Sequence, residues 1–226
     1  MVELLSIPYS YMVQTSPISK TISTLGDLEQ RFKLSPTDND LFFQEWQQDL
    51  PELTAEEKGK LDQIQGRFLR HRKRSPLTEG VINQLLIGPL LALAGLYDEP
   101  FYLTTEASVE VEVEEKDEVL RGRIDTLVIA QQLWVLLVES KSTISFSVAL
   151  PQLMTYMMAN PNPERPVYGM IGSGDEFMFV KMLTAGVPQY DLSNVFYLLL
   201  PRRNQLYDVL SILKQIAKIM SANIGQ

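Results

Sequence analysis

The sequence predicts an α/β or α+β fold, in which helices pack on a sheet, and three observations support this prediction. Residues 107–113 alternate Val with Glu, as a strand with one face in water does. Residues 119–130 and 133–141 read as two strands that are apolar on both faces, joined by a tight turn at Gln131-Gln132. Apolar residues at helical spacing precede and follow these strands. The order of helices, three strands, helix, strands and helix is typical of a sheet domain covered by helices.

Two helices are predicted before the first strand. Thr54 to Glu57 form a capping box, and apolar residues at helical spacing follow as far as Leu69. Ser75-Pro76 has the residues of a helix start, with Ser as the N-cap and Pro in the first turn. The strongly apolar run that follows should kink at Pro89.

The remaining segments complete the prediction. Residues 1 to about 50 are weakly patterned, although Phe42, Phe43 and Trp46 suggest a short amphipathic helix. The later elements are a helix over 148–160, a hairpin of 166–172 and 176–183, a last strand over 195–200 and a C-terminal helix over 206–220. We expect residues 1–74 to form a helical N-terminal extension packed on a core domain of residues 75–226.

The composition excludes several classes of active site. The 226 residues include no Cys and one His, so disulfides, thiolate zinc sites, Cys nucleophiles and His-rich zinc sites are all excluded. Hydrolytic chemistry would therefore depend on carboxylates, Lys and a hard metal ion. The longest uncharged apolar run, residues 85–96, is too short to span a bilayer, and Met1-Val2-Glu3 lacks the basic start of a secretory signal. We expect a cytoplasmic protein with no membrane partner.

The net charge of −8 is unevenly distributed. Residues 106–118 hold seven acids and one Lys, which leaves only −2 for the rest of the chain. The strongest basic cluster lies just upstream and consists of Arg67, Arg70, Arg72, Lys73 and Arg74. These residues could contact DNA phosphates. Exposed cations that offset the dipole at a helix end explain them equally well.

The most informative polar residues lie on the two apolar strands. Asp125 is in one strand, and Glu139-Ser140-Lys141 ends the next, after thirteen intervening residues. Charges that end a buried strand are costly unless they are paired or bind a metal ion. Glu139 and Lys141 share a face because they are two residues apart. Two carboxylates together offer the oxygen ligands that Mg²⁺ prefers, and a neighbouring Lys can orient water or stabilise charge on a phosphate.

The hairpin register tests this hypothesis. If Gln131-Gln132 is a simple two-residue loop, Asp125 lies opposite Val138, and Glu139 points to the other face. An odd loop or a β-bulge would put Asp125 and Glu139 on the same face. A joint metal site therefore predicts such an irregularity.

Three other residues support a site at these strand ends. Glu79 lies near a helix start, on an apolar stripe where a Glu is out of place. A first-turn acid favoured by the helix dipole explains it equally well. Gln152 and Tyr156 share one face of the helix after Lys141. A packing role is the simpler interpretation for Tyr156.

The order Glu79, Asp125, Glu139-Ser140-Lys141 and Gln152-x-x-x-Tyr156 resembles the PD-(D/E)XK nuclease superfamily. The similarity is greatest to the N-terminal nuclease domain of type I restriction motor subunits and to stand-alone cyanobacterial restriction-endonuclease-like proteins. "TEGVINQLLIGPLLALAGLY" resembles their first helix, and "YGMIGSGDEFMFVKM" their later hairpin. The resemblance covers about residues 75–200. The sequence departs from the family pattern at Ile124, where the name-giving motif has Pro.

The resemblance implies a restriction-endonuclease-like central mixed β-sheet and a Mg²⁺-dependent endodeoxyribonuclease that hydrolyses DNA phosphodiester bonds. Asp125 and Glu139 would bind Mg²⁺, or Mn²⁺ as a substitute, and Lys141 would be the catalytic lysine. Glu79 would assist the metal ion or the water, and Gln152, with Tyr156 beside it, would help place the DNA strand. No nucleotide cofactor is expected, and a homodimer is one open arrangement.

Two other classes of function remain open. A non-catalytic nucleic-acid or protein-binding module on the same fold would keep the sheet but not the chemistry. A metal-dependent phosphohydrolase acting on a small molecule would use the same carboxylates.

Overall fold

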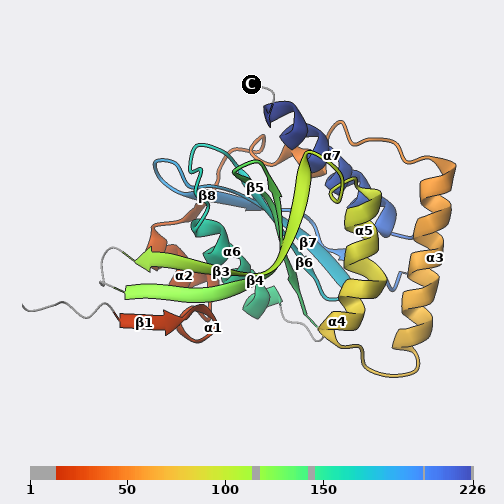
Figure 1. Ribbon diagram of the computed structural model, residues 1–226, viewed down its shortest axis with the longest axis horizontal. Helices are drawn as coiled ribbons and strands as arrows, with labels where there is room; N and C mark the ends of the chain where they lie inside the picture. Colours follow the sequence, from red (N-terminus) through yellow and green to blue (C-terminus); the bar gives the residue numbers. More distant parts are fainter. Residues whose placement is uncertain (1–13, 114–117, 142–145, 201, 225–226) are drawn as a thin grey trace, which may run out of the picture.

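The computed structural model describes residues 14–113, 118–141, 146–200 and 202–224. The N-terminal residues 1–13 and the acidic-window residues Glu114, Glu115, Lys116 and Asp117 lie outside the described residues. The predicted mixed α/β class is confirmed, because a nine-stranded mixed sheet lies between two layers of helices (Figure 1). None of the described helices combines the length and apolar character that crossing a bilayer requires.

The sheet has the strand order β1-β4-β5-β6-β7-β8-β2, with β3 paired to β4 and β9 paired to β7. The pairs β1–β4, β5–β6 and β2–β8 are parallel, and the other pairs are antiparallel. The strands are β1 (Gln14–Pro17), β2 (Ser35–Pro36), β3 (Phe101–Val113), β4 (Glu118–Ala130), β5 (Leu133–Ser140), β6 (Val167–Gly172), β7 (Glu176–Leu183), β8 (Gln189–Leu192) and β9 (Phe196–Tyr197).

Helices cover both faces and enclose two apolar cores. One core holds buried residues of α3 (Ala55–Arg72), of α5 (Gly88–Leu93) and of α7 (Leu206–Ile224). The other core holds residues of α1 (Ile18–Thr21), α2 (Leu25–Phe32) and α6 (Phe146–Met158). Gly169 allows α6 to lie close to β6, because a Cβ there would come within 2.8 Å of Leu153.

The first half of the chain differs from the sequence prediction in several places. The Thr54 capping box is present at the start of α3. The next helix does not begin at Ser75, however, because the Ser75 N–H bonds the His71 carbonyl and so belongs to the end of α3. Helix α4 (Glu79–Ile82) has Thr78 as its N-cap residue. The sequence predicted a helix kinked at Pro89. The structure has a π-helical turn, Asn83–Ile87, between α4 and α5 instead.

Short elements were the hardest to predict. The expected amphipathic helix around Phe43 is a single 3₁₀ turn, Gln44–Trp46, although Phe43 itself is fully buried. The last predicted strand shrinks to β9, and β8 was not predicted. Segments β1 and β2 add strands to the sheet from the first part of the chain, where only helices were expected.

Candidate active site

The β4–β5 hairpin contains the irregularity that a joint acid site requires. Ala130 and Ile129 pair with Leu133 and Trp134, whereas Val128 pairs with Leu136. Val135 is therefore an extra residue on β5, and it forms a β-bulge. The pairing ends at Thr126 and Val138, so Asp125 and Glu139 are the next residues on the two strands and would face each other if the register continued. The condition set by the metal-site hypothesis is met.

Asp125 lies at the point where β4 separates from β5. Its Oδ2 accepts a hydrogen bond from the Ser140 backbone N–H at 2.8 Å, so the side chain bridges the gap between the strands. Burial raises the pKa of Asp125, the Ser140 N–H and Lys141 lower it, and the charges of Glu79 and Glu106 raise it again. The net effect is a raised pKa, so the surroundings of this half-buried carboxylate do not fully offset the cost of burying its charge.

Glu139 is the most unusual carboxylate in the described part of the chain. Its side chain is only 1% exposed, and Lys141 Nζ lies 2.5 Å from its Oε1. Apart from this ion pair, neither oxygen receives a hydrogen bond from the described residues. Burial, followed by the charge of Asp125, raises the pKa of Glu139 to about 7. A carboxylate this poorly solvated would gain from a cation.

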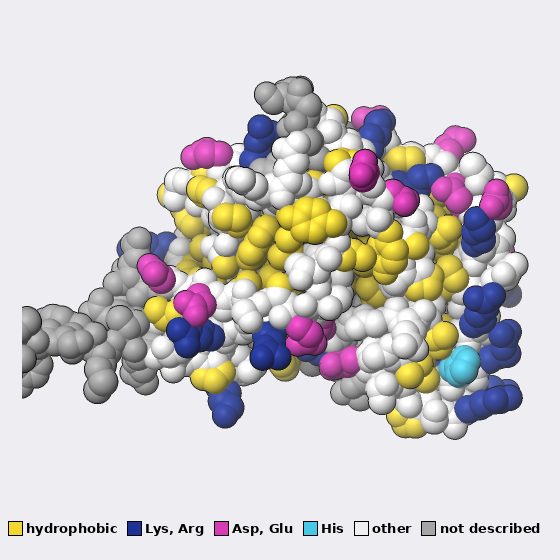
Figure 2. Space-filling model, in the orientation of Figure 1, with side chains coloured by type: hydrophobic (Ala, Val, Ile, Leu, Met, Phe, Trp, Pro, Cys, Tyr) yellow, Lys and Arg dark blue, Asp and Glu magenta, His cyan; other side chains and the backbone are white. Residues whose placement is uncertain are grey.

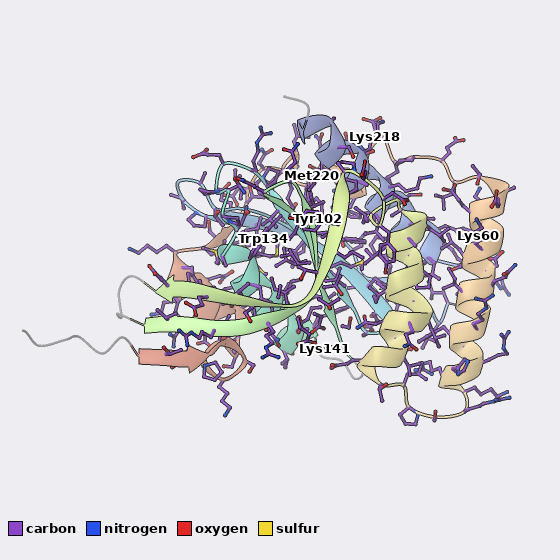
Figure 3. The ribbon with its side chains drawn as sticks, in the orientation of Figure 1. Lys60, Tyr102, Trp134, Lys141, Lys218 and Met220 are labelled. Carbon is purple, nitrogen blue, oxygen red and sulfur yellow. The ribbon has the colours of Figure 1, made fainter. Side chains whose placement is uncertain are left out.

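Lys141 follows β5 directly and is held in place by its backbone. Its N–H bonds the Gly172 carbonyl of β6 at 3.0 Å, and its side chain is 24% exposed. Burial lowers the pKa of Lys141, but Glu139 and the other nearby acids outweigh this effect and raise it. Lys141 is therefore a cation at neutral pH. Figure 3 labels it near the start of α4, far from Lys60 on the outer helix α3.

Ser140 connects the strand end to the π-helical turn. It is fully buried, and its hydroxyl is hydrogen-bonded to Asn83 Oδ1. Because side chains alternate along β5, Ser140 points to the opposite face from Glu139 and Lys141. The contact fixes the α4–α5 segment against the end of β5. Sequence reasoning did not identify Asn83, since one polar residue in an apolar helix has no special signal.

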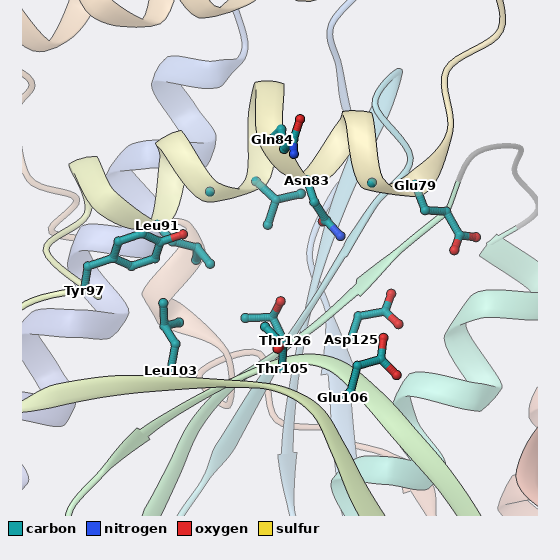
Figure 4. Close-up of a pocket in the computed structure, with 13 residues that line it drawn as sticks. Glu79, Asn83, Gln84, Leu91, Tyr97, Leu103, Thr105, Glu106, Asp125 and Thr126 are labelled. Atoms are coloured by element: carbon teal, nitrogen blue, oxygen red, sulfur yellow. The ribbon is translucent and has the colours of Figure 1, made fainter.

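Glu79 is the first residue of α4 and is exposed. It lines the same cavity as Asp125, and Figure 4 shows its carboxylate on the side of the cavity where Asp125 lies. Its charge raises the pKa values of Asp125 and Glu139. Within the described ranges, no three acidic or His side chains lie close enough together to hold one metal ion. The structure thus brings Asp125, Glu139 and Lys141 together and leaves Glu79 at the edge.

Glu106 is a residue of this site that the sequence analysis missed. The flanking pairs Thr105–Thr126 and Ala107–Ile124 place it opposite Asp125, and the two side chains are neighbours in Figure 4. Its φ of 55° is left-handed, which is uncommon for a residue other than Gly. Sequence reasoning assigned Glu106 to the acidic window on the wet strand, where acids need no special explanation.

The β3–β4 ribbon changes faces at Glu106 and Asp125. Leu103 packs in the core next to α7, whereas Val109, also odd-numbered, packs in the core next to α6. On β4 the even-numbered Ile124 and Val128 divide in the same way. A regular strand would keep such residues on one face. Both acids therefore lie at the crossover, where the ribbon passes from one helix layer to the other.

Gln152 and Tyr156 lie on α6, near the Glu139 side of the sheet. Gln152 Nε2 donates to the Tyr156 hydroxyl at 2.7 Å. Burial raises the pKa of Tyr156, the Gln152 bond lowers it, and the charge of Glu139 raises it further. Tyr156 packs on Gly122, where a Cβ would come within 2.4 Å of its ring. The ring is a buried packing residue, and Gln152 is the more accessible of the two.

The basic cluster lies on a different part of the surface. Figure 2 shows Lys and Arg side chains gathered along the edge that α3 forms. Arg72 makes a two-point ion pair with Asp175 in the β6–β7 turn, so it is not available to another anion. All five members are exposed, and the four without this ion pair are Arg67, Arg70, Lys73 and Arg74. His71 is exposed among them and away from the carboxylates, so it is not positioned as their general base.

No protein-family model matches this sequence. A search of curated proteins also found no match.

Proposed function

We propose that this protein is a Mg²⁺-dependent endonuclease of the PD-(D/E)XK type that hydrolyses DNA phosphodiester bonds. The observation that carries the proposal is Glu139, a buried carboxylate that is ion-paired with Lys141 but receives no other hydrogen bond from the described residues. Asp125 is the next residue of β4 beyond the Thr126–Val138 pair, on the strand beside Glu139, and Lys141 contacts Glu139. This combination supports a site that holds a cation and acts on a phosphate.

The residues fit Mg²⁺. This ion is commonly bound by one or two carboxylates and completes its shell with water and substrate phosphate oxygens. Asp125 within β4 and Glu139 near the end of β5 can supply these two carboxylates. When bound, the ion would polarise the phosphate and lower the pKa of a coordinated water. Asp125 and Glu139 would hold it, and Glu79 or Glu106 could orient its waters.

The other side chains would act on the phosphate and its water. Hydrolysis breaks the P–O bond to the leaving oxygen and forms a bond from phosphorus to the water oxygen, while the water loses one proton and the leaving oxygen gains one. The ammonium of Lys141 is placed to donate to that water or to a phosphate oxygen, where negative charge develops. Gln152 would help position the DNA strand. The four members of the basic cluster that are not paired with Asp175 would bind more distant phosphates, and this binding would weaken with salt.

Plasmid cleavage tests the assignment. In Mg²⁺ or Mn²⁺ we expect the wild-type protein to nick or linearise supercoiled plasmid DNA and Asp125→Asn to be inactive. The matched control is Glu110→Gln, because Glu110 is an exposed acid on β3 that is ion-paired with exposed Arg121. The control should cleave like the wild type. Equal cleavage by wild type and Asp125→Asn, or no cleavage in either metal, would contradict the proposal.

A non-catalytic binding module is the second candidate, and one observation favours it. Lys141 already neutralises Glu139 at 2.5 Å, so the pair is charge-balanced without a metal ion. Calorimetric titration with Mg²⁺ separates the two candidates. Absence of binding at millimolar concentrations, together with intact DNA in the cleavage assay, would favour the binding module.

A further inference from the structure

A cavity of about 520 Å³ extends from Asp125 along α4 and α5. The helices form one wall, and strands β3 and β4 form the other (Figure 4). This volume falls within the usual range for small-molecule sites. Asp125 lines the cavity, whereas Glu139 and Lys141 do not, so the part that extends away from Asp125 requires a separate explanation.

The two ends of the cavity differ in chemistry. Glu79, Glu106 and Asp125 form one end, and Leu91, Tyr97 and Leu103 form the other (Figure 4). Tyr97 is 47% exposed although it is a large aromatic residue. Its hydroxyl lies against Gly88, where a Cβ would come within 3.2 Å of it. The glycine therefore gives the tyrosine its place beside the helix.

Hydrogen-bonding groups lie between the two ends. Figure 4 shows Asn83 on the helix wall facing Thr105 and Thr126 on the strand wall. Neither threonine hydroxyl has a hydrogen-bond partner in the described part of the chain. The Asn83 oxygen is used by Ser140, which leaves its amide NH₂ available. Donors and acceptors thus surround the middle of the cavity.

The order of the acidic end, the polar middle and the aromatic end along the cavity matches the chemistry of one nucleotide. A metal-bound phosphate fits the acidic end, an aromatic ring can stack on Tyr97, and the polar middle can bond the edge of a base. Leu103 and Glu106 are three residues apart on β3, or about 10 Å. That spacing is comparable to the reach of a nucleotide from its phosphate to the far edge of its base.

We infer that this cavity receives one unpaired base beside the phosphate to be hydrolysed, so that the substrate is single-stranded or locally unpaired nucleic acid. The assignment of the phosphate end rests on the proposed function. The base end rests on the cavity itself. A base in an intact duplex is stacked and paired and would have to leave the helix to enter. Stacking on an aromatic side chain accepts any base, so Tyr97 itself is not expected to confer a sequence preference.

The inference is tested by measuring the binding of a short labelled single-stranded oligonucleotide by fluorescence anisotropy in Mg²⁺. Lys141→Ala serves as the parent protein, because it keeps both carboxylates and is expected not to cut the probe. In this parent, Tyr97→Ala should weaken binding of the single strand about tenfold, since stacking is lost. Tyr97→Phe should bind like the parent. Binding of the matching blunt duplex should be unchanged by either substitution.

Tyr102→Ala is the matched control, because Tyr102 is 50% exposed on β3 but does not line the cavity. It should leave single-strand binding unchanged. The inference would be overturned if the parent protein did not bind the single strand, or if Tyr97→Ala bound it as tightly as the parent. It would also be overturned if Tyr97→Ala lost affinity for the duplex and the single strand equally. The proposed function fails separately: Tyr97-dependent binding without any metal-dependent cleavage by the wild type would retain the base pocket and reject the nuclease.

Discussion

Two partly buried Lys–Glu pairs lie at this sheet, and they differ in how many hydrogen-bond and charge partners each side chain has. Lys181 of β7 contacts Glu45 at 2.6 Å, bonds the Phe42 carbonyl at 2.6 Å and lies over two aromatic rings. Glu45 Oε1 also accepts from the Tyr168 hydroxyl at 2.7 Å, and only its Oε2 lacks a partner. Glu139, in contrast, has Lys141 alone, and no oxygen with a hydrogen bond from the described residues.

The difference separates a structural pair from a candidate functional pair. The first pair joins the segment before α3 to the sheet, and its lysine has several partners that it would lose on moving. The second pair lies where β4 and β5 separate, and its carboxylate retains capacity to accept from a ligand. An ion pair that exists for stability is expected to be well satisfied, whereas a catalytic one is expected to be left incomplete.

The largest expected difference is in activity. Lys141→Met should lower the rate of DNA cleavage by about two to four orders of magnitude, the usual range for loss of a positioned proton donor. Lys181→Met should leave the rate per folded molecule within about twofold, because Lys181 is outside the acid site. Plasmid cleavage under single-turnover conditions measures both. Similar losses in the two variants would mean that Lys141 has no special role.

The stability effects should have the opposite order. Lys181→Met leaves Glu45 buried without its cation, which should cost about 3–5 kcal/mol of unfolding free energy. Lys141→Met should cost less than about 1 kcal/mol near pH 6, because Glu139 can take up a proton instead. Urea unfolding of both variants at that pH makes the comparison. Equal costs would remove the distinction between the pairs.

The pH dependence should identify Glu139 in metal-free protein. Its pKa rises from the usual 4.5 to about 7 in the folded state, so the folded protein binds the proton more tightly than the unfolded chain. Its contribution to stability is then complete below pH 4.5 and is lost as the pH rises through 7. Glu139→Gln removes this dependence, so at pH 8 the variant should be more stable than the wild type by about 3 kcal/mol. Thermal unfolding in chelator at pH 5 and pH 8 tests it, and parallel curves would contradict it.

The smallest effect is stabilisation by the metal ion itself. Mg²⁺ at about ten times its dissociation constant should raise the unfolding free energy by about 1.4 kcal/mol. Lys181→Met should keep this increment, and Asp125→Asn should lose it. Thermal unfolding with and without Mg²⁺ measures the increment. An increment that persists in Asp125→Asn would place the metal elsewhere.

Sequence periodicity predicted the central part of the fold because long apolar strands and capped helices have strong local signals. The core strands and helices α3, α6 and α7 were expected close to their observed positions. Strands β1 and β2 are four and two residues long, so they carry no measurable alternation. They exist because their backbones pair with β4 and β8, which no local pattern encodes.

The candidate site was predicted in part. Asp125, Glu139 and Lys141 stood out because charges at apolar strand ends need an explanation, but two apolar faces left their register undetermined. Glu106 was missed because its left-handed φ and its place opposite Asp125 depend on the bend of the β3–β4 ribbon. Its neighbours in sequence are ordinary strand residues.

The bulge at Val135 also has a consequence for recognising proteins of this kind. The extra residue, Val135, lies between the pairs Ile129–Trp134 and Val128–Leu136. The residues on either side of the bulge remain paired. A relative with one residue fewer at this position could form an uninterrupted hairpin and still present the same two acids to each other. A search pattern that fixes the number of residues between the acids would reject that relative. The feature to compare is which residues face each other across the hairpin, and a one-residue gap in an alignment here is no sign of a lost site.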